Sequence, residues 1–188
     1  MIVIYIILGI LTRTVWHIAP NVEFVTALSL AGAFFMRRTY SIIIPLGIMI
    51  ITDLIIGNSS VIIFTWSAFT LAWLGGRIGA SEKIANIFKR LPDGIRMIFL
   101  SELMGILFTI FFFLWTNFGV VVVSDMYPKT VEGLIHSYMM GIPFLIPQLL
   151  GNIIIVPCIF LTTKIVYNMK GSLLPQVLRN RLFGMVRF

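Results

Sequence analysis

Six apolar segments occupy most of the chain, and each is about 15 to 23 residues long. That length is close to the roughly 20 residues with which a helix crosses a hydrocarbon core of about 30 Å. Inside lipid every backbone amide must be paired within the protein, and a helix pairs its own. The segments are residues 2–16, 22–36, 42–56, 61–78, 97–115 and 144–166. We therefore predict an all-α membrane protein, with residues 1–188 forming one domain built as a six-transmembrane-helix bundle.

The balance of polar and apolar residues supports this prediction. Hydrophobic residues make up 59% of the chain and charged residues 11%, whereas charged residues make up roughly 25% of a soluble domain. The first segment has a second interpretation, because its apolar core of residues 2–11 also has the length of a signal-peptide core. No basic residue precedes that core and no small-residue cleavage pattern follows it, so we predict a first span. The single cysteine, Cys158, excludes a disulfide within the chain.

Basic residues indicate the orientation of the predicted spans. All Lys and Arg residues except Arg13 and Lys129 lie at the ends of segments two, four and six or in the stretches that follow them. Lys and Arg accumulate on the cytoplasmic side of membrane proteins, so we predict a multi-pass protein of the cell membrane with both termini in the cytoplasm. The tail, residues 171–188, predicts an amphipathic segment at the inner membrane surface. The net charge of +7 then reflects contact with membrane lipids or a cytoplasmic partner rather than with nucleic acid.

Two carboxylates interrupt apolar segments near their predicted outer ends. Glu23 lies near the start of the second segment and Asp53 near the end of the third, so both approach the same depth. Ionisable groups inside a membrane are costly and mark functional sites by default. A structural role is an equally open interpretation of Glu23, and the preceding Asn21 is either part of the same site or a helix cap. If both carboxylates stay charged, they favour a cationic or hydrogen-bond-rich ligand.

Further polar and aromatic residues gather on the predicted outer side. Asn58 lies in a connection so short that segments three and four must form a tight hairpin, and Trp66 lies in the outer half of segment four. Trp66 and Trp73 are also typical of the aromatic belt at a membrane surface, which is the better interpretation for Trp73. Gln148 and Asn152 are four positions apart and share one face of segment six. Their amides are candidates for lining the same outer cavity.

The longest predicted outer connection is residues 116–143, and long connections often carry binding elements. Its candidate binding residues are Asn117, Tyr127, Lys129, Glu132 and His136. From Thr130, a capping residue, the sequence predicts a short helix with the last two of these on one face. A Glu-His pair is compatible with a metal, but a solvated helix face is the better interpretation because no third ligand is near in the sequence.

The chain lacks the motifs of ATP hydrolysis and of common hydrolases. It has no phosphate loop that ends in Lys-Ser or Lys-Thr, no His-Glu-x-x-His and no Gly-x-Ser-x-Gly. No nucleophile with an adjacent base is evident. We therefore expect neither enzyme activity nor a metal or cofactor, although a membrane enzyme that uses Glu23 and Asp53 stays an alternative.

Several stretches of the chain resemble the substrate-binding S components of energy-coupling-factor vitamin transporters, and especially an uncharacterised six-helix subgroup. They are Ala19 to Ala33, Thr52-Asp53 with Gly57, residues 116–119 and residues 126–135. The resemblance implies an S-component-like six-helix bundle with a substrate cavity near its outer surface, closed by outer loops. It also implies partners, namely one scaffold membrane subunit and two ATPase subunits. It does not supply the substrate.

The same resemblance implies a contact with the scaffold subunit through small residues at four-residue spacing. Ala27-x-x-x-Ala31 and Ser29-x-x-x-Ala33 have this form. Such spacing lets helices approach closely, so packing inside the bundle is at least as good an interpretation. We name Ala27 and Ala31 as the candidate partner-binding residues.

These observations together predict a substrate-binding membrane subunit for the uptake of a small solute, such as a vitamin or related micronutrient, energised by separate ATPase and scaffold subunits. The candidate substrate-binding residues are Asn21, Glu23, Asp53, Asn58, Trp66, Asn117, Tyr127, Lys129, Glu132, His136 and Asn152. Two alternatives stay open. One is a membrane enzyme that acts on a lipid or isoprenoid substrate, and the other is an assembly partner that transports nothing.

Overall fold

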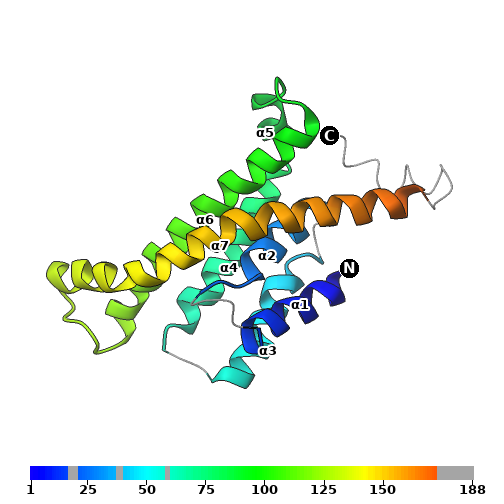
Figure 1. Cartoon of the computed structure of the whole chain (residues 1–188). Coiled ribbons are helices and arrows are strands. Elements are labelled where there is room, and N and C mark those ends of the chain that lie inside the picture. Colours follow the sequence, from blue (N-terminus) through cyan, green and yellow to red (C-terminus); the bar gives the residue numbers. More distant parts are fainter. Residues whose placement is uncertain (17–20, 37–39, 58–59, 173–188) are drawn as a thin grey trace.

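The computed structural model describes residues 1–16, 21–36, 40–57 and 60–172, with side chains described as far as residue 169 (Figure 1). Within these residues the chain forms helices and no strand, which confirms the all-α class. The helices are α1 (Ile2–Thr14), α2 (Val25–Phe35), α3 (Ile43–Ile56), α4 (Ile62–Gly79), α5 (Glu82–Ile87), α6 (Asp93–Val123) and α7 (Val131–Ser172). Most of the predicted tail, residues 173–188, lies outside the described residues.

Helix α2 lies at the centre of the bundle. Each of its 11 residues is buried, and it contacts α1, α3, α4, α6 and α7. A Cβ atom added to Gly76 of α4 would lie 2.5 Å from the backbone oxygen of Leu30 and 2.9 Å from the Ala33 side chain. Helix α4 therefore packs with its backbone directly against α2, which small side chains on both helices permit.

Helices α6 and α7 form a long antiparallel hairpin beside α2 and α4 (Figure 1). Asp93–Val123 and Val131–Met169 are long and apolar enough to cross a membrane, and α1, α2 and α3 are shorter apolar helices. Only 22% of the most apolar window of each long helix is buried inside the protein, whereas the core helix of a soluble domain would be covered. The two long helices therefore indicate membrane association.

The predicted outer connection of residues 116–143 is wrong. Helix α6 continues to Val123 and α7 already begins at Val131, so the two helices are joined by residues 124–130 alone. The stretch 116–123 contains no proline, and Pro143 and Pro147 are accommodated inside α7. Prolines are tolerated inside membrane helices because neighbouring groups satisfy the backbone carbonyls that they free. The short helix predicted from Thr130 is the first part of α7.

Two local predictions near the ends of helices have different outcomes. The tight connection between segments three and four is confirmed, because α3 ends at Ile56, α4 begins at Ile62 and Gly57 takes a positive φ of 98°. The predicted helix cap at Asn21 is wrong, because α2 begins only at Val25, with Phe24 at the N-cap position and no side-chain cap. Asn21 instead adopts a left-handed backbone with φ of 59°, which asparagine tolerates better than most residues.

Candidate functional site

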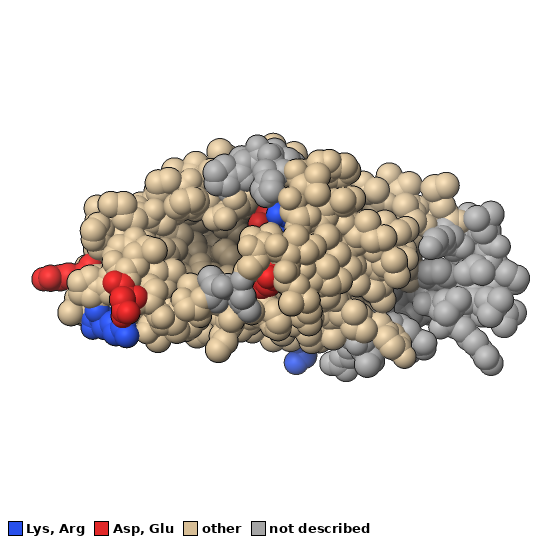
Figure 2. Space-filling view, turned by 90° about the horizontal axis from the view of Figure 1, so that it is seen from below, with Lys and Arg blue, Asp and Glu red and all other residues tan. Residues whose placement is uncertain are grey.

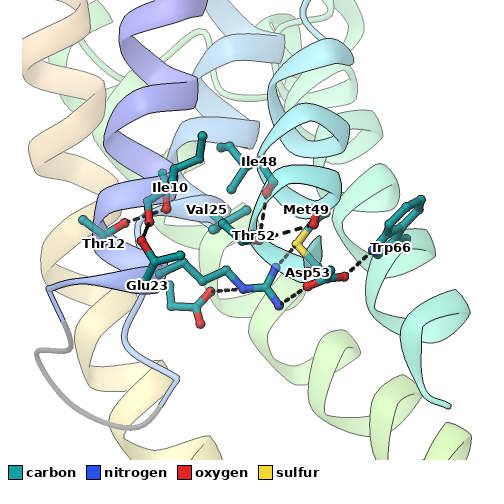
Figure 3. Close-up of polar contacts among 12 residues, drawn as sticks. Ile10, Thr12, Glu23, Val25, Ile48, Met49, Thr52, Asp53 and Trp66 are labelled. Atoms are coloured by element: carbon teal, nitrogen blue, oxygen red, sulfur yellow. Dashed lines mark hydrogen bonds and ion pairs between the residues drawn. The ribbon is translucent and has the colours of Figure 1, made fainter. Parts of the chain in front are cut away.

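Arg13 links the two carboxylates that the sequence analysis singled out. Its Nη2 atom lies 3.0 Å from Oδ1 of Asp53, and its Nε atom lies 3.7 Å from Oε2 of Glu23. The three residues come from the end of α1, the stretch before α2 and the last turn of α3 (Figure 3). Their side chains are 16%, 10% and 30% exposed for Arg13, Asp53 and Glu23. Largely shielded from solvent, these charges interact more strongly than they would in water.

Asp53 extends this cluster to a third helix. Its second carboxylate oxygen, Oδ2, accepts a hydrogen bond of 2.6 Å from the indole Nε1 of Trp66 on α4. Because one carboxylate oxygen faces the guanidinium and the other faces the indole, the Asp53 side chain is held from both sides (Figure 3). Arg13 also contacts the sulfur of Met49 on α3. We call Arg13, Glu23, Asp53 and Trp66 the Arg13 cluster.

The Arg13 cluster lies at one end of the helical bundle. This end contains the last turns of α1, α3 and α6 and the first turns of α2, α4 and α7, and we call it the Arg13 end. It is the end that the distribution of basic residues predicts to face outside. Sequence reasoning placed Glu23 and Asp53 there but did not assign Arg13 to the site. The available signal was that Arg13 is one of only two basic residues on the predicted outer side.

An aromatic cluster occupies the same end, between α4 and α6. The ring centroid of Phe64 lies 5.1 Å from that of Trp115 and 6.1 Å from that of Phe118, and Trp115 stacks on Phe118 at 5.9 Å. The indole Nε1 of Trp115 donates a hydrogen bond of 2.9 Å to the Ser67 hydroxyl on α4. The indole is therefore fixed both by ring contacts and by its polar atom.

A cavity of about 480 Å³ opens at the tip of the α6–α7 hairpin. It is lined by Phe118, Val121, Val122, Lys129, Thr130, Val131 and Leu134. Phe118 belongs to the aromatic cluster as well, so the cluster forms part of the cavity wall. Figure 2 shows the molecule hollowed between the α6–α7 tip and the part formed by α1 and α3, with acidic and basic side chains at the edge of the hollow. This end therefore combines charged groups, aromatic faces and open space, as ligand sites do.

Comparison with known proteins identifies the family. Residues 1–174 match a family of unknown function named DUF6580. The chain belongs to DUF6580. No curated protein and no solved structure matches this DUF6580 chain.

Two asparagines of the DUF6580 chain lie at the contact between α6 and α7. The Asn152 amide nitrogen donates a hydrogen bond of 2.8 Å to the buried Thr109 hydroxyl. Asn117 bonds through its side chain to the Phe113 carbonyl one turn earlier, and its backbone oxygen accepts from Ser137 on α7 at 3.2 Å. Gln148 is buried as well. Asn117 and Asn152 therefore join the two long helices, and neither lines the cavity.

The remaining candidates of the sequence analysis are spread around the hairpin tip. The rings of Tyr127 and His136 touch edge to face, with centroids 5.5 Å apart. Lys129 lines the cavity, whereas Glu132 is exposed and does not. Within the described part of the chain, His, Cys, Asp and Glu residues form no group of three or more that suits a metal ion. Asn21 is exposed, and Asn58 lies outside the described residues.

The prediction that Ala27 and Ala31 bind a partner is corrected by the structure. Both are 0% exposed, as are Ser29 and Ala33. Their small side chains let the neighbouring helices approach α2 closely. They therefore contribute to packing inside this DUF6580 bundle and offer no surface to a second protein.

Proposed function

We propose that this DUF6580 protein is a substrate-binding membrane subunit for the uptake of a small solute, such as a vitamin or related micronutrient. The observation that carries the proposal is the combination, at one end of an apolar helical bundle, of a shielded charge cluster, an aromatic cluster and an open cavity whose wall includes Phe118 of that aromatic cluster. The resemblance of the sequence to S components of energy-coupling-factor transporters agrees with this arrangement. The proposed partners are one scaffold membrane subunit and two ATPase subunits.

In this proposal helices α1, α2, α3, α4, α6 and α7 are the six spans, and the Arg13 end faces outside. At 1.5 Å per residue, α1 and α3 are about 20 Å long and α6 is about 46 Å long. A hydrocarbon core is about 30 Å thick, so α1 and α3 require local thinning of the bilayer, whereas α6 is long enough to tilt or to project beyond it. In this proposal the longer α6 extends farther outward than α1 and α3, so the Arg13 cluster lies deeper than the hairpin tip. A solute that enters from outside would then pass the tip first.

The charge cluster supplies a reason for specificity in such a site. Arg13 compensates the Asp53 carboxylate at hydrogen-bonding distance and the Glu23 carboxylate at a longer distance. A shielded charge that loses its partner is costly, so the cluster is held together in the absence of a solute. A solute whose polar or charged groups pair with Arg13, Asp53 or Glu23 more favourably than water does would bind there in preference to water.

The proposal is tested by purifying the full chain from its source membrane in mild detergent. Native mass spectrometry is expected to detect one scaffold subunit, two ATPase subunits and a retained small molecule. Uptake of that molecule into proteoliposomes is expected to require ATP. If the chain instead turned over a lipid or isoprenoid without any ATPase, the enzyme alternative would hold. A complex with other membrane proteins that retains no small molecule and transports none would favour the assembly alternative.

A further inference from the structure

The cavity at the α6–α7 tip is almost entirely apolar. Five of its seven lining residues are Phe118, Val121, Val122, Val131 and Leu134. A sixth lining residue is Thr130. Its hydroxyl accepts a hydrogen bond of 3.2 Å from the backbone N–H of Gly133 and so caps the start of α7. A volume of about 480 Å³ lies within the roughly 300 to 1,000 Å³ of small-molecule sites. The space therefore suits the apolar body of a small molecule.

Among the described residues that line this cavity, Lys129 alone is charged. The ion pairs found in the described part of the chain are Arg13 with Glu23, Arg13 with Asp53, and Arg96 with Asp93. Lys129 is in none of them, although Asp125 and Glu132 are near it in the sequence. Its ammonium group is thus available for a charge that comes from outside the chain. The other cation of the Arg13 end, Arg13, is already engaged by two carboxylates.

Two apolar residues of the cavity lining are also exposed on the surface of the bundle. Val122 and Val131 are 45% and 74% exposed, and both lie in the turns of α6 and α7 next to the connection 124–130. Because α6 is longer than a hydrocarbon core is thick, these turns project beyond the core in the proposed arrangement. Exposed apolar surface outside the hydrocarbon core has no lipid chains to cover it and typically marks a ligand or partner site. An apolar ligand body would cover this surface.

We infer that the cavity binds a small organic anion, with its apolar body against the α6–α7 lining and its anionic group at Lys129. This inference rests on the proposed function, because it names the substrate class of that site. The structure gives two separate reasons for it, namely the apolar volume and the unpaired cation on its lining. It differs from the expectation of a cationic or hydrogen-bond-rich ligand, because Arg13 already compensates the two shielded carboxylates.

The inference is tested by direct binding to the purified full chain in nanodiscs, without any ATPase. The probes share one phenylbutyl body and differ in the head group, which is a carboxylate, a phosphate, an alcohol or an ammonium. Dissociation constants measured by equilibrium dialysis are expected to rank either anion ahead of the alcohol and the ammonium last. Comparison of the two anions then distinguishes a carboxylate substrate from a phosphate substrate.

Three variants assign the binding to this cavity. Lys129→Met keeps the aliphatic stem and removes the charge, so it is expected to weaken anion binding roughly ten- to hundredfold while alcohol binding is unchanged. Val122→Trp fills the cavity and is expected to weaken all four probes. Lys89→Met, which removes an exposed cation at the opposite end of the bundle, is the matched control and is expected to change nothing.

Two results would overturn the inference. One is equal anion binding by Lys129→Met and the unchanged protein, and the other is tighter binding of the ammonium probe than of both anions. Unaltered folding of Lys129→Met is checked by its thermal midpoint without ligand. If no ATPase or scaffold subunit co-purifies but the Lys129-dependent preference for anions persists, the proposed function fails and the anion site stands.

Discussion

Arg13 on α1 and Asp53 on α3 form an ion pair in which the guanidinium Nη2 lies 3.0 Å from the carboxylate Oδ1. The pair joins two helices that pack side by side, and both side chains are at least four-fifths shielded from solvent. Asp53 is held further by the indole of Trp66 on α4. The pair therefore connects three helices at the end of the bundle that contains the candidate site.

The coupling between these two residues is the first prediction. Arg13→Gln and Asp53→Asn are each expected to lower the free energy of unfolding, because each leaves a shielded charge without its partner. The double variant is expected to lose less than the sum of the single losses, with a coupling of about 0.5 to 3 kcal/mol. Thermal or denaturant unfolding in detergent measures all four proteins. Additive losses would mean that the pair contributes nothing to stability.

A second prediction concerns ligand binding at the same cluster. Once a retained small molecule has been identified, the thermal stabilisation that it gives is expected to fall in Asp53→Asn. The change removes the negative charge but leaves an oxygen that can still accept from the Trp66 indole, so the hydrogen bond to α4 is kept. Trp66→Phe is the companion variant that removes the indole donor instead. Unchanged affinity in Asp53→Asn would remove Asp53 from the binding site.

The sequence predicted the helical class because apolar segments of membrane-spanning length are a strong signal, and it predicted the hairpin at Gly57 from the shortness of the connection. It failed between Thr116 and Pro143. There, residues 116–143 were predicted to be an outer connection because they lie between two apolar segments. The structure has Pro143 and Pro147 inside α7, although proline ends helices in water. Inside an apolar bundle the neighbouring helices and side chains compensate for the lost hydrogen bonds. The sequence of one segment does not contain that information.

The candidate site was predictable in part for a similar reason. Glu23 and Asp53 stand out because a carboxylate inside an apolar segment is rare. Arg13 does not stand out, because a single arginine after an apolar segment is ordinary. Its role depends on the packing of α1 against α3, which brings it to both carboxylates. Asn152 illustrates the reverse error, since its partner is the buried Thr109 rather than a cavity.

Close packing between α2 and α4 leads to a third prediction. A Cβ atom at Gly76 would lie 2.5 Å from the Leu30 backbone oxygen, and backbone cannot move aside as a side chain can. Gly76→Ala is therefore expected to lower the free energy of unfolding by about 1 to 3 kcal/mol. Gly94→Ala in α6 is the matched control, because nothing lies within 4 Å of its added Cβ and alanine is the better helix former. Unfolding of both variants in detergent measures the contrast, and equal stability would contradict it.

The hydrogen bond between α6 and α7 gives a fourth prediction. Thr109→Val keeps the shape of the side chain but leaves the Asn152 amide without its acceptor in a buried position. The expected loss of unfolding free energy is about 0.6 kcal/mol and at most about 1.7 kcal/mol, the average and the maximum for such bonds between membrane helices. Thr162→Val is the control, because that hydroxyl is exposed and bonds only to the Cys158 carbonyl of its own helix. A loss of the same size in the control would show that the effect is not specific to the α6–α7 contact.

The orientation in the membrane gives the last prediction, which tests whether the Arg13 end faces outside. The single cysteine is first removed by Cys158→Ala. In this background, either Lys129→Cys or Arg90→Cys introduces one thiol at an exposed position, and the two positions lie at opposite ends of the bundle. A membrane-impermeant maleimide added to intact cells is expected to label the first variant and to label the second only after permeabilisation. The expectation follows from the accumulation of basic residues around Arg90 on the side where membrane proteins keep them. If intact cells label the second variant and not the first, the orientation is the reverse. The cavity and the Arg13 cluster would then lie on the cytoplasmic side, where they could not receive a solute from outside.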